Sequence, residues 1–138
     1  MMRVAIDTNV ILVSFGRNSR YRFLADALAQ QRYTLLVSTE IMLEYEEVLY
    51  RRQHPLQAGT ALLFLQNAVS VQRVDVFYRW NLIHTDPDDN KFVDCAIAGN
   101  ADAIVSEDAH FGSLKNIPFP TVKVLSVTEF AAALGIEV

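Results

Sequence analysis

The sequence of 138 residues lacks several features that would place it in a specialised class. Its single cysteine, Cys95, excludes an internal disulfide and is expected to be a small buried side chain inside an apolar segment. No apolar run reaches the roughly 18 residues that a membrane span needs, and the N-terminus has no cationic stretch followed by an apolar run. We therefore expect a cytoplasmic protein that is not bound to a membrane.

Positive charge is also scarce. The 12 lysines and arginines stand against 16 aspartates and glutamates, and the net charge of −4 gives no general attraction to nucleic acid. A polyanionic substrate must therefore be held by a local basic patch or by bound cations. The length and the 51% of hydrophobic residues suit one domain with a substantial core, so residues 1–138 are expected to form a single domain.

Short apolar runs alternate with segments of helical period along the chain. Short buried strands that alternate with helices imply an α/β protein with a parallel sheet covered on both faces. Residues 71–83 have a mixed period and are expected to be irregular with some strand. Strands are predicted at residues 3–6, 33–37, 103–106 and 122–125, and helices at 21–30, 40–52, 56–69, 92–99 and from 127 to 134, with a brief helix near 111–114.

Residues that cap helices stand where most of these helices are expected to begin. A capping side chain accepts a hydrogen bond from a free main-chain N–H in the first turn, and proline is favoured at the first helical position. The cap residues are Thr8 and Asn9 after the first strand, Ser19 before 21–30, Ser38 or Thr39 before 40–52, Asp86 followed by Pro87, and the capping box from Ser126 to Glu129.

Acidic residues recur where the predicted strands end. Asp7 and Asp108 each close a strand at the edge where open α/β sheets bind ligands. Asp89 lies in the first turn of a helix, and Glu44 borders the buried stripe of helix 40–52. Carboxylates that converge from four separate segments repel one another unless a cation lies between them. Mg²⁺ or Mn²⁺ is the natural occupant, because both ions prefer carboxylate and water oxygens.

Nitrogen and sulfur donors show no comparable arrangement. Cys95, His54, His84 and His110 have no ligand spacing, which disfavours a site for a soft metal. His110 follows Asp108 by two residues; of two interpretations, protonation of a leaving group and a loop histidine without a role, we favour the second. A phosphatase of the haloacid-dehalogenase type is also disfavoured, because it needs a second aspartate where this chain has Asn9.

Four motifs taken together resemble one family, the PIN-domain proteins. The motifs are Asp7-Thr8-Asn9, Ser38 to Leu49, Asp86 to Phe92 and Ile104 to Asp108, and the similarity runs from Val4 to about Leu114. The resemblance implies a three-layer α/β/α sandwich with a central parallel sheet. It also implies a metal-dependent ribonuclease, since many members are VapC-like toxins of toxin–antitoxin pairs.

Carried over position by position, the resemblance implies four catalytic and metal-binding acids with two supporting polar residues. The acids are Asp7, Glu44, Asp89 and Asp108, and the supporting residues are Asn9 and Ser106. The stretch after Asp86 is richer in acids than the family pattern requires, so the third ligand is Asp89, which we rank first, or Asp94, or both. For Asp86 and Asp88, helix capping is the favoured interpretation.

The function expected from the sequence is hydrolysis of RNA with Mg²⁺ or Mn²⁺ as cofactor. Candidates for holding the phosphate backbone are Arg17, Arg20, Arg22 and Lys91. The resemblance further implies a cognate antitoxin as partner and a homodimer, for which the apolar region from Leu56 to Phe64 offers a surface. The alternative is a catalytically inactive PIN-fold module that binds nucleic acid or acts as a scaffold.

Overall fold

Five strands form one parallel sheet in the order β3-β2-β1-β4-β5, and this confirms the α/β class predicted from the sequence. The computed structural model describes residues 1–137. Each strand is short and mostly buried, as expected of parallel strands that are covered on both faces. The strands are β1 (Arg3–Ile6), β2 (Thr34–Val37), β3 (Val71–Arg73), β4 (Ala103–Val105) and β5 (Val124–Leu125).

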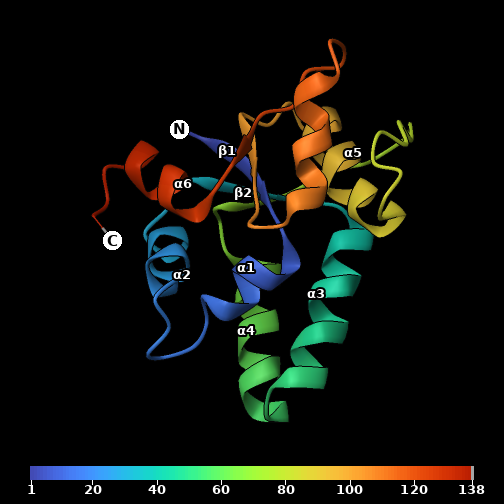
Figure 1. Cartoon of the computed structure of the whole chain (residues 1–138). Coiled ribbons are helices and arrows are strands. Elements are labelled where there is room, and N and C mark those ends of the chain that lie inside the picture. The colour runs from blue at the N-terminus through green and yellow to red at the C-terminus, as the bar shows by residue number, and fades with distance from the viewer. Residues whose placement is uncertain (138) are drawn as a thin grey trace.

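Helices flank this sheet on its two sides. In Figure 1, α1, α2 and α4 lie below the strands and α5 lies above them. The connections explain this division, because right-handed crossovers that run in opposite directions along a sheet place their helices on opposite faces. The helices are α1 (Thr8–Val13), α2 (Arg22–Ala29), α3 (Thr39–Arg52), α4 (Pro55–Asn67), α5 (Asn90–Ala98) and α6 (Val127–Ala133), with 3-10 helices η1 (Pro87–Asp89) and η2 (Ala109–Asn116).

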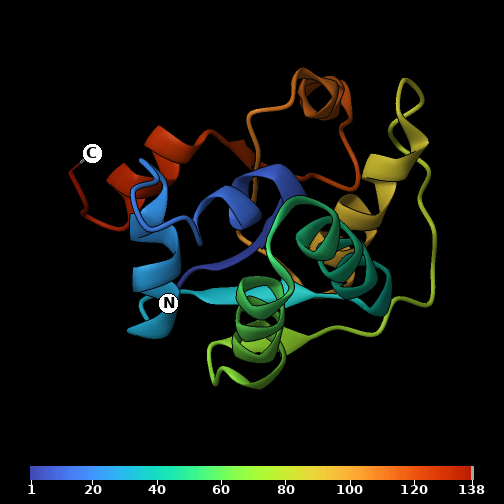
Figure 2. The same cartoon turned by 90° about the horizontal axis from the view of Figure 1, so that it is seen from below.

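The two longest helices, α3 and α4, pack side by side as an antiparallel pair (Figure 2). Gln53 and His54 connect them, and the His54 side chain caps α4 by accepting a hydrogen bond from the main-chain N–H of Leu56. Tyr45 of α3 is fully buried, and its hydroxyl donates to the carbonyl of Ile6 at the end of β1. This bond ties α3 to the sheet edge. Among residues 1–137, no helix is both long enough and apolar enough to cross a membrane.

The central strands β1 and β4 mark the point where the direction of the connections reverses. The chain leaves β1 toward β2 on one side and leaves β4 toward β5 on the other. Ile6 pairs with Val105 across these strands, so both strands end at the same level. In open parallel sheets, the crevice outside the carboxyl ends at such a reversal is where ligands bind.

Most predicted element boundaries hold within two residues, and the differences have local causes. Ser38, rather than Thr39, caps α3 through a bond from the N–H of Ile41. Thr8 and Asn9 do not cap α1, because Asp7 occupies the cap position and Thr8 is already helical. The helix predicted to start at residue 92 begins at 90 after η1, and the last strand is limited to 124–125.

Candidate metal centre

Asp7 and Asp108 meet outside the ends of β1 and β4 through one serine. The N–H of Asp7 donates to the carbonyl of Val105 at 3.0 Å, which continues the strand pairing. The Ser106 hydroxyl donates to Asp7 Oδ2 at 3.0 Å and accepts from the N–H of Asp108 at 2.9 Å. Ser106 therefore holds the two acids together. Burial raises the pKa of Asp7. The hydrogen bond from Ser106 lowers this pKa in part, and the negative charge of Asp108 raises it further.

Glu44 reaches the same place from the second turn of α3. Its carboxylate accepts a hydrogen bond from the Thr8 hydroxyl, so Thr8 positions Glu44 and does not cap α1. The other oxygen lies 2.6 Å from Lys91 Nζ, and the side chains of this ion pair are 27% and 15% exposed. The charge of Glu44 also contributes to the raised pKa of Asp7, as expected for neighbouring carboxylates.

Asp89 completes the set from the turn that opens α5. It is buried, and burial is the main reason why its pKa rises to about 6. The negative charges of Asp86, Asp108 and Asp7 raise the pKa further, while a hydrogen bond to His110 lowers it. The structure thus brings together all four acids predicted from the sequence, from α3, η1 and the ends of two strands.

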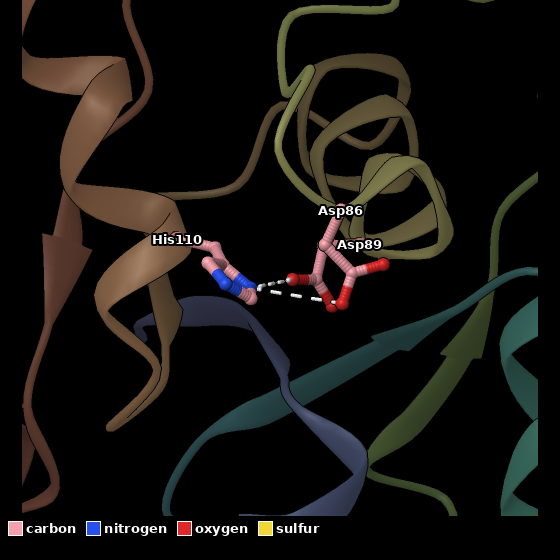
Figure 3. A group of neighbouring side chains, drawn as sticks. All are labelled: Asp86, Asp89 and His110. Atoms are coloured by element: carbon pink, nitrogen blue, oxygen red, sulfur yellow. Dashed lines mark hydrogen bonds and ion pairs between the residues drawn. The ribbon is translucent and has the colours of Figure 1, made fainter.

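Two further side chains belong to this cluster that the sequence analysis did not include. His110 is not an isolated loop residue, since η2 turns its imidazole toward the acids (Figure 3). Its Nδ1 lies 3.2 Å from Asp108, 3.3 Å from Asp89 and 3.6 Å from Asp86. Asp86 does cap η1 through the N–H of Asp88, as predicted, but its other oxygen faces His110. The Asp-x-His spacing at 108–110 was the available signal.

Asp94 and Asn9 lie in other surroundings. Asp94 is buried and accepts a hydrogen bond from the N–H of Trp80 at 3.0 Å, with Arg79 and Glu40 as its charged neighbours. It thus anchors the segment after β3 to α5, and the structure groups only Asp89 of the two alternatives with the other acids. Asn9 is exposed on α1.

The predicted basic residues have unequal surroundings. Arg22 pairs with Asp26 within α2, and Lys91 is engaged with Glu44. Arg17 is exposed in the loop after α1. The Arg20 guanidinium lies over the ring of Tyr21, 4.9 Å from its centre. Both residues line a cleft of about 460 Å³, and its lining also includes Glu107, the neighbour of Asp108 in the chain. None of the four clustered acids lines this cleft.

The donor set suits a hard divalent cation. Buried carboxylates that repel one another raise each other's pKa, and a cation between them relieves both effects. Carboxylate oxygens are the ligands that Mg²⁺ and Mn²⁺ prefer. Asp86, Asp89 and His110 each offer a ligand atom, and these atoms lie within 4.8 Å of one another. The residues therefore fit the metal that the sequence predicted.

The fold and its acidic edge define a class of protein, the PIN domain. A family model with this description matches residues 3–110, and the chain therefore belongs to the PIN domain family. A solved structure of similar fold is the crystal structure of VapBC2 from Rickettsia felis bound to a DNA fragment from their promoter. Its TM-score is 0.62 at 17% identity, and the match covers 91% of this chain and 98% of that one. No curated protein matches this sequence.

Proposed function

We propose that this protein is a metal-dependent endoribonuclease that hydrolyses phosphodiester bonds in RNA, with Mg²⁺ or Mn²⁺ as cofactor. The observation that carries the proposal is the convergence of Asp7, Glu44, Asp89 and Asp108 beside the strand ends at the reversal between β1 and β4. Membership of the PIN domain family, whose members are typically nucleases, supports the same activity.

In this proposal the four acids hold the cation and orient the reacting groups. When bound, a divalent ion would offset negative charge on the phosphate and lower the pKa of a water molecule. Asp7, Glu44, Asp89 and Asp108 would be the ligands, and Ser106 fixes the positions of Asp7 and Asp108. Glu44 is fixed by Thr8 and Lys91, which keep its carboxylate directed at the cluster. The Lys91 ammonium, 2.6 Å from Glu44, would also place a positive charge beside a phosphate held at the acidic cluster.

The cleft beside Arg20 and Tyr21 is the proposed path of the RNA. An arginine that contacts phosphate and an aromatic ring that stacks on a base are the usual means of holding a single strand. Arg17 extends the positive charge of the same loop. Because salt weakens each contact between a cation and a phosphate, we expect RNA binding to weaken as salt is added, with a modest slope set by the small number of these cations.

A role as the toxin of a toxin–antitoxin pair is the finer form of the proposal. It is supported by membership of the PIN domain family and by the similar fold of the VapBC2 structure. A small antitoxin would bind across the acidic site and block it. A gene for such a partner beside the gene for this chain, together with inhibition of cleavage by its product, is the test. Cleavage that continues with the complex formed would contradict this role.

We also propose a homodimer. Leu56 and Leu63 of α4 are 76% and 63% exposed, and their spacing of seven residues places them on one face of the helix, where they offer an apolar contact to a second copy. Light scattering at about 50 µM, a concentration above the dissociation constant of an ordinary stable dimer, is expected to give twice the mass of the chain. A monomer at that concentration would rule the dimer out.

One observation favours the alternative, a module that binds nucleic acid without cutting it. Lys91 already supplies a positive charge to Glu44, which lowers the need for a metal ion at that acid. The two functions differ in whether cleavage is observed. In the alternative, RNA binds and stays intact whatever cation is added.

The deciding assay compares cleavage of a mixed RNA pool by the wild type, Asp7→Asn and Glu44→Gln, with Mg²⁺, Mn²⁺ or chelator. Cleavage is expected for the wild type only, and only with metal. Matched controls are Asp88→Asn and Glu47→Gln, the same changes at exposed acids, which are expected to cleave like the wild type. Equal cleavage by all variants would indicate a contaminating nuclease. No cleavage by the wild type with any metal would favour the alternative function, a module that binds nucleic acid without cutting it.

A further inference from the structure

The imidazole of His110 occupies an unusual position among the acids. Its Nδ1 is within 3.2–3.6 Å of carboxylate oxygens from Asp86, Asp89 and Asp108. Figure 3 shows the ring edge directed at Asp86 and Asp89, which reach it from the turn before α5. A single Nδ1–H donates well to one acceptor, so hydrogen bonding alone does not require three acids around this nitrogen.

The spacing of these atoms agrees with ligands that share one ion. Oxygen ligands lie about 2.1 Å from an octahedral Mg²⁺, so neighbouring ligand atoms are about 3 Å apart and opposite ones about 4 Å apart. The ligand atoms of Asp86, Asp89 and His110 all lie within 4.8 Å of one another. The group is therefore close to the size of a coordination shell before any ion is added.

The position of His110 is also held firmly. The main-chain N–H of His110 donates to Asp108 Oδ1 at 2.9 Å, which fixes the first turn of η2. The next residue, Phe111, is fully buried and packs edge to face on Phe92 of α5, with ring centres 6.4 Å apart. Because α5 follows directly from Asp89, this aromatic pair joins the element that carries the imidazole to the element that carries the acid.

We propose that His110 Nδ1 is a ligand of the bound cation and makes the site select Mn²⁺ over Mg²⁺. This inference rests on the metal site of the proposed function and adds a donor to its carboxylates. Mg²⁺ takes oxygen ligands almost exclusively, whereas imidazole nitrogen binds transition metals well. A nitrogen among the carboxylates therefore raises the affinity for Mn²⁺ much more than the affinity for Mg²⁺.

The test measures metal binding directly, without RNA. Calorimetric titration with Mn²⁺ and with Mg²⁺ is compared for the wild type, His110→Ala and His110→Asn. Loss of a nitrogen donor is expected to weaken Mn²⁺ binding about tenfold or more and Mg²⁺ binding less than about threefold. Pulsed electron paramagnetic resonance of bound Mn²⁺ is expected to detect a coordinated nitrogen in the wild type and in the control His84→Asn, which changes an exposed histidine. The signal is expected to vanish in both His110 variants.

The outcomes separate this inference from the proposed function. If Mn²⁺ binds to the wild type but its spectrum contains no coordinated nitrogen, His110 is only a hydrogen-bond partner and the inference is overturned. The carboxylate site and the nuclease proposal then stand. If the His110 variants lose Mn²⁺ and Mg²⁺ affinity equally, the proposal that His110 makes the site select Mn²⁺ is wrong. If neither ion binds to the folded wild type, the inference and the metal dependence of the proposed activity are both wrong.

Discussion

Replacing Asp89 with asparagine is expected to stabilise the metal-free protein, although Asp89 is one of the proposed ligands. The side chain is buried beside Asp86, Asp108 and Asp7, and its pKa is raised from 3.8 to about 6. Near neutral pH the folded chain must therefore carry a charge that its surroundings disfavour. Asparagine has nearly the shape of the protonated acid and carries no charge.

The magnitude follows from the pKa. A rise from 3.8 to about 6 means that ionising Asp89 costs about 3 kcal/mol more in the folded chain than in the unfolded chain. This cost is already net of the hydrogen bond to His110, which favours the charged acid. We therefore expect Asp89→Asn to raise the free energy of unfolding by about 2–3 kcal/mol at pH 7.5.

The effect of Asp89→Asn must also depend on pH in a defined direction. Because the folded-state pKa is raised, the stability that protonated Asp89 contributes is fully present below about pH 4 and is lost as the pH rises through about 6. The advantage of the variant is therefore small at pH 4, grows between pH 4 and 6, and is constant above about pH 7.

The measurement is urea unfolding in chelator at several pH values for the wild type, Asp89→Asn and the exposed control Asp88→Asn. Added Mn²⁺ is expected to reverse the order, since a ligand at about 1,000 times its dissociation constant stabilises the folded wild type by about 4.1 kcal/mol. A destabilised Asp89→Asn variant in chelator, or an advantage that is the same at pH 4 and pH 7.5, would refute the reasoning.

Three other substitutions test contacts that hold the site or the core in place. Ser106→Ala removes the hydroxyl that joins Asp7 to the end of β4 and is expected to weaken Mn²⁺ binding about tenfold in calorimetric titration, while unchanged affinity would argue against this support. Tyr45→Phe removes a buried hydrogen bond and is expected to lower the free energy of unfolding by about 1–2 kcal/mol, whereas an unchanged urea midpoint would contradict this. Gly99→Ala places a Cβ 2.9 Å from two core methyl groups, so thermal unfolding is expected to reveal a loss of about 1–3 kcal/mol rather than a gain.

The acids at the strand ends could be predicted because a local signal and a general rule agree on them. Asp7 and Asp108 each stop an apolar run, and the ends of neighbouring parallel strands meet at one sheet edge. Glu44 required one more step, namely its position beside the buried stripe of a helix with a clear period. These inferences depend on periodicity, which a single sequence contains.

The rest of the candidate site depends on contacts between distant segments. His110 joins the acids because η2 packs its buried Phe111 against Phe92, and no local pattern specifies that pairing. Thr8 is a residue type that caps helices, but its hydroxyl donates to Glu44, which lies 36 positions later in the chain. In both cases a tertiary contact replaced the role that the local sequence favoured.

The bond between Ser106 and Asp7 has a consequence for the order of events during synthesis. It joins residues 99 positions apart, and the strand before Ser106 pairs directly with the first strand of the chain. The N-terminal segments leave the ribosome first, yet they cannot complete the acidic site until β4 and the residues after it have emerged. A chain whose synthesis stops before residue 103 has Asp7, Glu44 and Asp89 but neither β4 nor Asp108. Truncated products of this gene are therefore expected to lack the assembled acidic cluster, whatever helices they form.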